Sequence, residues 1–387
     1  MLLRRKGIRT RGPRATMYAY VLRKILYNIP VYLGIILIMM AALRINDPVA
    51  AYVGKNATAE TIALKRHSMG LDRPFLPIAA ENEEHPFDPS LKPWITFGGY
   101  TTTRELASGA TEKVRHTVRL YSPVACQYVE FIWRIVRLDF GTKAEPYNSW
   151  QYESENVGEK LRQSVLPTVK VTVPTLILTS LVAIIVGMLS AYYRGTFLDR
   201  TMMFFVVLGM SVSVVVFIVL GQTVFRDWVN GLVGAEVFAN NGYEPGVENW
   251  VRYCALPVII GVFIGIGYDT RFYRAVMVEE TARDYITTAI AKGATKPKIM
   301  FVHMLKNAMI PVITRIMITI PFLVTGSIVM EYQFRIPGMG KLLIDALTNK
   351  DFPIIQTFGA MFALIFIVTN ILTDVLYAMV DPRVRLS

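Results

Sequence analysis

Long apolar runs alternate with polar segments along the chain. Six of these runs contain no charged residue: Ile25–Leu43, Val171–Tyr193, Thr201–Phe225, Tyr253–Tyr268, Ile316–Met330 and Phe352–Thr373. A helix of roughly 20 residues crosses a membrane hydrocarbon core about 30 Å thick. The pattern therefore predicts an all-α polytopic membrane protein with six transmembrane helices. The fourth and fifth runs are short, and lengthening the fifth through 307–314 places Arg315 near the membrane boundary.

Composition supports the membrane class. Of the 387 residues, 53% are hydrophobic and only 18% are charged, which is unusual for a soluble protein. The basic residues before the first run also fit a cleaved signal peptide. That run has no convincing small-residue cleavage site and is long enough to span a membrane, so an uncleaved helix is favoured.

Basic residues determine the predicted orientation, because they collect on the cytoplasmic side of membrane proteins. Eight of them precede or begin the first helix: Arg4, Arg5, Lys6, Arg9, Arg11, Arg14, Arg23 and Lys24. Both termini are therefore expected in the cytoplasm of a multi-pass protein of the plasma (inner) membrane. The acidic 226–250 loop is expected outside. This bias and contact with anionic membrane lipids explain the net charge of +12 without a nucleic-acid partner.

Residue types that carry catalysis or bind cofactors are scattered. Cys126 and Cys254 are expected to be unpaired, and the four histidines show no metal-ligand spacing. The segment Gly338–Lys341 lacks the earlier glycine and the following Ser or Thr of a phosphate-binding loop. We therefore expect no metal site, no cofactor and no enzymatic activity in this chain.

The loop between the fourth and fifth runs is basic and helix-forming. From Glu279 to Lys292 the pattern predicts a helix with one apolar face: Ala282, Tyr285, Ile286, Ala289 and Ile290. Gly293 follows, where a left-handed conformation is needed and glycine enters it most freely. Thr295 can cap a second helix with Pro297 in its first turn. One side of this second helix is expected to carry Ile299, Val302, Leu305 and Met309.

These residues predict two short amphipathic helices joined at a fixed bend on the cytoplasmic side. A helix pair that rests on anionic lipid, with no further role, is an alternative that the pattern leaves open.

The same segment resembles the cytoplasmic loop of ABC importer permeases of the dipeptide/oligopeptide/nickel, binding-protein-dependent subfamily. The matching residues are Asp284, Tyr285, Thr288, Ala289, Ala291, Lys292, Gly293, His303, Leu305, Lys306, Asn307, Ala308 and Pro311. In that family the loop docks into a groove of the ATP-binding subunit. The resemblance therefore implies a coupling site made of Asp284, Tyr285, Thr288, Ala289, Ala291, Lys292, Gly293, Ala294, His303, Lys306 and Asn307.

Other segments are similar to the same family, in the family's order: Met69–Leu76, Arg137–Lys143, Leu166–Arg200, Glu331–Gln356 and Asp381–Ser387. Three features depart from its usual pattern. Thr287-Thr288-Ala289 stands where the general signature has Glu-Ala-Ala, residues from about 77 to 127 form an apparent insertion, and Arg315 replaces an apolar residue. A residue that extends its charge to the inner interface is the favoured interpretation of Arg315 over a role in substrate binding.

The expected organisation combines this resemblance with the apolar runs. It comprises a basic cytoplasmic amino terminus (1–24), a first transmembrane helix (25–45), an external region (46–165), a five-helix permease core (166–380) and a cytoplasmic carboxyl terminus (381–387). The external region contains the insertion at about 77–127, and the core contains the coupling loop at 271–310.

The resemblance implies a permease subunit of an ATP-driven importer, for peptides or similarly handled solutes, that forms half of the translocation pathway. Its expected partners are a second, non-identical permease, ATP-binding subunits that hydrolyse the ATP, and an external solute-binding protein. A membrane scaffold or assembly protein and a channel or secondary transporter are the alternatives. A scaffold would not depend on a bend at Gly293, and a channel or secondary transporter would need its own energy or gating apparatus.

Overall fold

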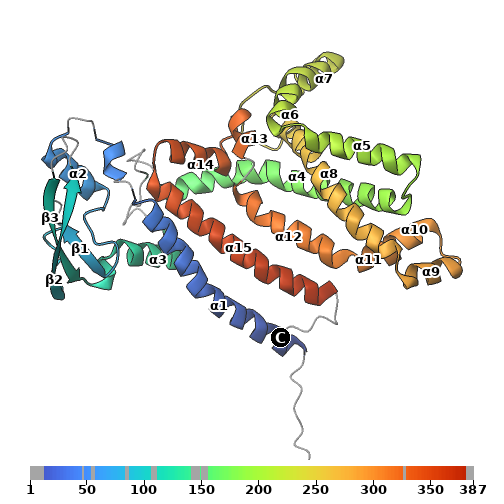
Figure 1. Cartoon of the computed structure of the whole chain (residues 1–387). Helices are drawn as coiled ribbons and strands as arrows, with labels where there is room; N and C mark the ends of the chain where they lie inside the picture. The colour runs from blue at the N-terminus through green and yellow to red at the C-terminus, as the bar shows by residue number, and fades with distance from the viewer. Residues whose placement is uncertain are drawn as a thin grey trace, which may run out of the picture. The chain divides into compact units, whose positions relative to one another are not determined.

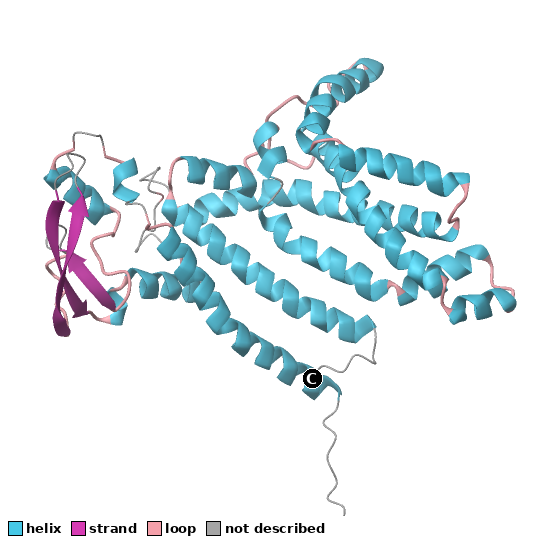
Figure 2. Ribbon diagram, in the orientation of Figure 1, coloured by secondary structure: helices cyan, strands magenta, loops and turns pink. Residues whose placement is uncertain are grey.

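The computed structural model describes residues 13–45, 48–53, 57–82, 87–105, 111–140, 149, 156–325 and 328–380. These residues are mostly helical (Figures 1 and 2) and form two compact units. Unit 1 combines the chain up to Pro30 with Leu161–Asp345 and the chain from Phe362 onward. Unit 2 combines Val31–Lys160 with Ala346–Met361. The predicted termini 1–12 and 381–387 lie outside the described residues.

Three long helices contribute residues to both units. They are α1 (Pro13–Ala42), α4 (Val157–Tyr192) and α15 (Phe352–Val380). The other elements of unit 2 are η1 (Pro48–Ala51), α2 (Ala59–Ser68), β1 (Ile78–Asn82), β2 (Ile95–Glu105), β3 (Thr111–Leu120), η2 (Pro123–Ala125) and α3 (Gln127–Arg137).

Unit 1 contains the remaining helices, of which α14 continues into unit 2 at Ala346. They are α5 (Phe197–Ser211), α6 (Val214–Leu220), η3 (Gly221–Phe225), α7 (Arg226–Val233), η4 (Val251–Ala255), α8 (Leu256–Thr281), α9 (Asp284–Ala291), α10 (Lys296–Lys298), η5 (Ile299–Met304), α11 (Leu305–Asn307), α12 (Met309–Thr325), α13 (Ile328–Gln333) and α14 (Met339–Thr348). Of these, η3, η4 and η5 are π-helical.

Five described helices are long and apolar enough to cross a membrane. They are Tyr20–Ala42, Val157–Tyr192, Val214–Val233, Val251–Thr281 and Phe352–Tyr377. A sixth results if Lys296–Asn307 and Met309–Phe322, which meet at 63°, are taken as one bent span. The prediction of a helical, polytopic membrane protein is confirmed.

The pattern predicted one helix over the third apolar run, but the structure has a break there. Helix α5 ends at Ser211, Val212 is extended with φ −95° and ψ 134°, and α6 begins after Ser213. The Ser211 hydroxyl donates to the Val207 carbonyl oxygen at 2.8 Å. Serine side chains compete for backbone hydrogen bonds and favour helix ends. The run is apolar throughout, so hydrophobicity alone did not reveal the break.

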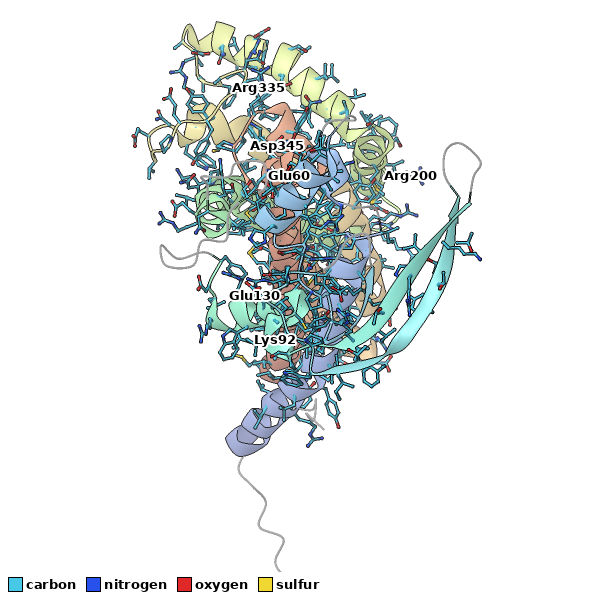
Figure 3. The ribbon with its side chains drawn as sticks, turned by 90° about the vertical axis from the view of Figure 1, so that its left-hand side faces the viewer. Glu60, Lys92, Glu130, Arg200, Arg335 and Asp345 are labelled. Atoms are coloured by element: carbon cyan, nitrogen blue, oxygen red, sulfur yellow. The ribbon has the colours of Figure 1, made fainter. Side chains whose placement is uncertain are left out.

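The insertion contains a small antiparallel sheet that the sequence analysis did not predict. Its strand order is β1-β3-β2, with Ile78 and Ile95 both paired to Leu120 (Figure 2). A bulge between Thr96 and Gly98 interrupts β2, and the β2–β3 pair extends as a long ribbon (Figure 3). β-Branched residues are frequent in these strands, as strand propensity favours.

The core of unit 2 joins three helices. Ile36 and Met40 of α1, Phe131 and Ile135 of α3, and Ala360 of α15 are buried together. Helix α3 is amphipathic, and its inward residues are one helical turn apart. This packing attaches α3 to the long helices of its own unit.

Small residues bring α4 and α8 together in unit 1 (Figure 1). A Cβ placed at Gly261 would lie 2.9 Å from Thr175 Cγ2, and one at Gly265 would lie 2.7 Å from Thr179 Cγ2. A Cβ at Gly187 would lie 3.0 Å from the backbone nitrogen of Arg274. Gly261 and Gly265 are therefore packing residues, because side chains there would push the two helices apart.

Candidate functional site

The loop after α8 begins later than the sequence pattern indicated. Helix α8 continues to Thr281, so Glu279 and Glu280 end this helix instead of starting the next. Arg283 is extended, with φ −79° and ψ 144°, and α9 begins at Asp284. The predicted helix start at Glu279 is therefore wrong. The apolar pattern continues across the break, whereas the backbone turns there.

The bend after α9 has the expected geometry. Gly293 is left-handed, with φ 76°. Its N–H donates to the Ile290 carbonyl at 2.9 Å, and the Ala294 N–H donates to the Ala289 carbonyl at 3.1 Å. This pair of bonds is the Schellman motif, in which a glycine ends a helix. The prediction of a fixed, glycine-dependent bend is confirmed.

The loop has two arms, α9 before Gly293 and the helical turns after it. The second arm buries different residues from those that the sequence pattern predicted. Thr295 is extended and Pro297 lies in the first helical turn, as expected, but the Thr295 side chain makes no capping hydrogen bond. The chain then forms the π-helix η5 instead of a continuous α-helix. A π-turn changes which residues share a face. Met300 and Met304 are consequently buried, whereas Val302 is 49% exposed.

Both arms pack on the ends of α4 and α8. Ile286, Ile299, Met300, Met304 and Ala308 of the loop are buried in one cluster. The cluster also contains Ala183, Met188 and Ala191 of α4 and Tyr273 and Met277 of α8. The Lys296 ammonium lies 5.6 Å from the centre of the Tyr193 ring, which follows α4. Because the cluster holds both sides of the bend, the loop and these two helix ends form one packed body.

The residues implied by the family resemblance separate into two groups. Ala289 is buried, and Tyr285, Ala294 and His303 are half-buried. The exposed members are Asp284, Thr288, Ala291, Lys292, Gly293, Lys306 and Asn307. The residues of the first group pack inside the loop, and those of the second group are exposed on its outer side. The predicted residues therefore do not all lie on one exposed surface.

Sequence reasoning missed apolar residues on the exposed side. Ile290, Phe301 and Val302 are 56%, 52% and 49% exposed. We call these residues, together with the exposed Lys292, Lys296 and Lys306, the coupling surface, a name that anticipates their proposed role. Phe301 had no assigned place in the predicted pattern. Ile290 and Val302 were expected to share one side with residues that the structure buries, because regular α-helices were assumed.

Polar contacts reinforce the start of α9. Tyr285 donates a hydrogen bond to Glu280, and Arg283 Nη2 lies 2.7 Å from Glu279 Oε1. Burial, followed by the contact with Glu280, raises the pKa of the Tyr285 hydroxyl to about 12. The hydroxyl therefore remains a hydrogen-bond donor at neutral pH.

A buried ion pair fixes the turn between α4 and α5 to α8. Arg274 donates to Asp199 through two nitrogens, Nε to Oδ1 at 3.0 Å and Nη2 to Oδ2 at 2.9 Å. Ser190 and the N–H of Gly195 also donate to this carboxylate. Paired donors of this kind give a strong, directional contact. This contact joins residues from distant parts of the sequence, so no local pattern indicated it.

Two further charged residues have partners within unit 1. Arg315 Nε donates to Asp269 Oδ1 at 2.8 Å, so this charge has a partner on α8. Its extension to the inner interface stays a prediction. Asp374 pairs with Lys24 and accepts a hydrogen bond from Tyr20 at 2.8 Å. Asp374 thus connects α15 to α1.

The glycine-rich start of α14 already holds a carboxylate. Glu331 is fully buried and accepts from the Thr168 hydroxyl at 2.8 Å and the Gly340 N–H at 2.7 Å. The Met339 N–H donates to the Thr168 oxygen at 2.7 Å. Helix N-termini favour negative charge. Here the negative charge comes from the chain itself.

One cluster could share a cation by its geometry. The ligand atoms of His67, Asp72 and Asp88 lie within 4.8 Å of one another. His67 Nδ1 is 2.5 Å from Asp72 Oδ2, so a hydrogen bond already joins this pair. The sequence spacing of these residues matches no common metal motif, which explains why the sequence analysis did not group them.

The cysteines are free and buried. Cys126 lies in unit 2 and Cys254 lies in unit 1. Their expected lack of pairing is confirmed.

Comparison with known proteins identifies the family. Residues 183–386 match the family described as binding-protein-dependent transport system inner membrane component. A chain of Sinorhizobium fredii, named as a probable peptide ABC transporter permease protein, is 28% identical over 371 residues, covering 95% of this chain and 100% of that one. The glutathione transport system permease protein of Salmonella choleraesuis is 28% identical over 374 residues, covering 95% of this chain and 99% of its own length.

The family match covers the coupling surface, the bend at Gly293, all of α8 and the end of α4 from Ala183 onward. Family membership implies ATP-binding subunits, which hydrolyse the ATP, and a solute-binding protein as partners. The several apolar helices agree with a multi-pass protein of the inner membrane. The chain belongs to the binding-protein-dependent transport system inner membrane component family, as a permease subunit of an ABC importer.

Proposed function

We propose that this chain forms half of a peptide-translocation pathway and couples it to ATP hydrolysis through the coupling surface. The observation that carries the proposal is the glycine bend at Gly293, packed against α4 and α8 while Ile290, Phe301 and Val302 remain exposed. Exposed apolar residues bordered by charges are typical of protein interfaces. The ATP-binding subunit is the partner of this surface.

The substrate class rests on the relatives. The two described above carry the words peptide and glutathione in their names. Both terms denote small molecules with amide bonds and charged ends. We therefore infer a peptide-like substrate for this chain.

The packing supports a mechanical route from the coupling surface into the spans. Helix α8 has 26 residues, and a rise of about 1.5 Å per residue makes it about 39 Å long. Its cytoplasmic end shares a buried cluster with both arms of the loop. A displacement of the coupling surface, driven by closure of the ATP-binding subunits, would be transmitted to α8 as a rigid body. Alternating access then follows from reorientation of α8 and its neighbours.

The remaining partners and the orientation belong to the same proposal. We place both termini and the coupling loop (271–310) in the cytoplasm, and the external region (46–165) outside, from the distribution of basic residues. The expected boundaries at 24, 45, 165 and 380 are retained. Six spans are few for a solute pathway, so a second, non-identical permease completes it, and anionic lipids contact the basic cytoplasmic side.

The residues of the coupling site take two roles in this proposal. Tyr285, Ala289, Ala294 and His303 hold the loop in shape. Asp284, Thr288, Ala291, Lys292, Lys306 and Asn307 face the ATP-binding subunit. Gly293 allows the bend that connects the two groups.

Substitution of the bend glycine tests coupling. A Cβ at Gly293 would meet no atom within 4 Å, so Gly293→Val acts through the backbone conformation and not through a clash. A left-handed non-glycine residue costs roughly 1–2 kcal/mol, and more with a β-branched side chain. We expect strongly reduced ATP-dependent uptake in proteoliposomes, with normal membrane insertion and retained basal ATPase activity.

Gly234→Val is the matched control. Gly234 ends α7 with φ 69° and also has no atom within 4 Å of an added Cβ, but it lies outside the coupling loop. Its substitution should leave the ratio of uptake to ATP hydrolysis unchanged. Unchanged uptake in Gly293→Val, or an equal loss in both variants, would refute the coupling role.

Co-purification tests the partners. Mild-detergent purification from the native membrane is expected to recover a second permease and ATP-binding subunits in stoichiometric amounts. Recovery of the chain alone, even after crosslinking, would instead favour the scaffold or channel alternatives.

A further inference from the structure

An ion pair lies within the apolar part of unit 1. Asp269 belongs to α8 and Arg315 to α12, and both helices contribute to candidate membrane-spanning segments. Arg315 Nε and Asp269 Oδ1 are 2.8 Å apart, and the two side chains are 37% and 15% exposed. Ionisable residues inside a membrane are costly and commonly functional.

This ion pair is less completely satisfied than the other arginine–aspartate pair between helices of the same unit. Arg274 uses two nitrogens on Asp199, which also accepts from Ser190 and Gly195. Arg315 contacts Asp269 through Nε, and among the described residues its two terminal nitrogens donate to no acceptor. The Phe272 ring lies 5.8 Å from the Arg315 guanidinium carbon. The Asp269–Arg315 pair therefore retains hydrogen-bonding capacity for another molecule.

Buried hydroxyl groups lie along the adjacent α4–α8 contact. Thr179 Oγ1 and Thr270 Oγ1 have no hydrogen-bond partner among the described residues, whereas Ser180 Oγ and Tyr273 Oη lie close enough to interact with each other. The parent residues are 5%, 0%, 7% and 0% exposed. The Tyr273 hydroxyl lies close to Ser180 and within electrostatic reach of both Asp269 and Arg315. Buried polar groups normally have partners, so two of them without partners indicate water or a ligand.

Structural stabilisation alone does not account for this arrangement. Apolar side chains of similar volume are often as stabilising as a buried ion pair, or more so. A partly exposed pair beside unsatisfied hydroxyls is instead suited to exchange its contacts. When the site is empty, the two charges neutralise each other. When a dipolar molecule enters, each charge can turn to the opposite charge of that molecule.

We propose that Asp269 and Arg315 bind the two charged ends of a zwitterionic peptide during translocation. Arg315 takes the carboxylate, and Asp269 takes the ammonium group. The hydroxyls of Ser180 and Tyr273 provide hydrogen bonds for the peptide amide. This inference rests on the proposed peptide-import function, and it makes the ion pair a determinant of substrate specificity within the pathway.

Direct binding tests the assignment of each charge. The complex of both permeases and the ATP-binding subunits, without the solute-binding protein, is titrated with a labelled dipeptide, its C-terminal amide and its N-acetyl form. Charged hydrogen bonds predict that Arg315→Gln weakens dipeptide binding by about tenfold or more. The same variant should leave affinity for the amide unchanged. Asp269→Asn should weaken dipeptide binding similarly and leave affinity for the N-acetyl form unchanged.

Two further variants guard against a folding defect. The double variant Asp269→Asn/Arg315→Gln leaves no unpaired charge, so it should fold and lose discrimination at both ends of the peptide. Arg274→Gln removes a structural arginine of the same unit and should not change the ratio of dipeptide to amide affinity. Equal effects of Arg315→Gln on dipeptide and amide, or no effect on either, would overturn the inference.

Uptake by the wild-type complex separates this inference from the function on which it rests. Suppose that the wild-type complex imports dipeptides but the Asp269 and Arg315 variants bind the dipeptide and its blocked forms with unchanged relative affinities. The proposed function would then stand, and only the specificity role would be rejected. Failure of the wild-type complex, with its solute-binding protein, to import any peptide would reject both.

Discussion

At the scale of single residues, Thr168 connects two parts of unit 1 that are distant in sequence. Its hydroxyl donates to Glu331 Oε1 at 2.8 Å and accepts from the Met339 N–H at 2.7 Å. A Cβ at Gly338 would lie 2.5 Å from this oxygen, so the connection also needs a glycine. One hydroxyl thus joins α4 to the start of α14.

Thr168→Val should lower the stability of unit 1. Valine has nearly the same shape, but the buried Met339 N–H and one carboxylate oxygen would each lose a partner. Leaving a buried group unsatisfied costs about 1–3 kcal/mol. Thermal unfolding of the purified complex measures the effect. Thr175→Val is the control, because among the described residues that hydroxyl bonds to the Val171 carbonyl of its own helix alone, at 2.7 Å. Equal loss in both variants would contradict the connecting role of Thr168.

His67 makes the stability of unit 2 depend on pH. The hydrogen bond to Asp72 and the charge of that carboxylate raise the pKa of His67 above its usual value of 6.5. A raised pKa in the folded state means that the stabilisation is complete below about pH 6.5. It is then lost as the pH rises through the folded-state value.

We therefore expect the melting-temperature difference between wild type and His67→Gln to be greatest near pH 6 and to shrink toward pH 9. The effect should be small, since the imidazole is exposed and solvent screens the pair. In an Asp72→Asn background, the pH-dependent part of the difference should disappear. A difference that does not vary with pH, or that survives in this background, would show that Asp72 is not its cause.

At the scale of elements, an ion pair stabilises the turn between α4 and α5. Asp199 stands in the first turn of α5, and its side chain is only 6% exposed. Its partner Arg274 belongs to α8, about two turns before that helix ends at Thr281. The ion pair and the buried cluster beside it therefore stabilise the same end of unit 1.

Asp199→Asn is expected to destabilise this end of the unit by about 3 kcal/mol, because it leaves Arg274 without a counter-charge. Unfolding of the complex and protease sensitivity of the α4–α5 turn report the loss. Asp227→Asn provides the comparison, since Asp227 is 62% exposed and pairs with the neighbouring Arg226. Surface pairs of this kind contribute about 0–1 kcal/mol. If both variants behaved alike, the α4–α5 turn would not depend on its ion pair.

At the scale of the whole molecule, orientation in the membrane is the property to measure next. The chain has two cysteines, and both are buried. With these replaced by alanine, single cysteines can be introduced at exposed sites, Lys113 in β3 and Thr295 in the coupling loop. A membrane-impermeant maleimide added to intact spheroplasts should label the cysteine at 113 only. Permeabilised cells should label both.

The same pair of variants contains its own control, because labelling at 295 after permeabilisation shows that the site is reactive. Labelling at 295 in intact spheroplasts would reverse the proposed orientation. The coupling surface could not then face ATP-binding subunits in the cytoplasm.

Sequence-based predictions agreed with the structure where the constraint acts within a few residues or along one apolar run, and they failed at breaks within such runs. The apolar runs predict the long helices because the membrane requires a continuous apolar surface and internally satisfied backbone groups. Gly293 is predictable because a left-handed residue after a helix favours glycine, a constraint within a few residues. The breaks at Val212 and Arg283 were missed, since the apolar pattern continues through both. The π-helix at Ile299–Met304 likewise changed a face that regular periodicity had assigned.

The sequence by itself therefore determined the membrane class, the main helices and the glycine bend, all of which follow from local hydrophobicity and backbone sterics. Tertiary structure alone decided which charges and hydroxyls meet. Arg274 with Asp199, Arg315 with Asp269 and Glu331 with Thr168 are each separated by many residues in the chain. Their pairing depends on how the helices pack, which the order of residues within any one helix does not specify. The residues proposed here to select the substrate belong to this second class.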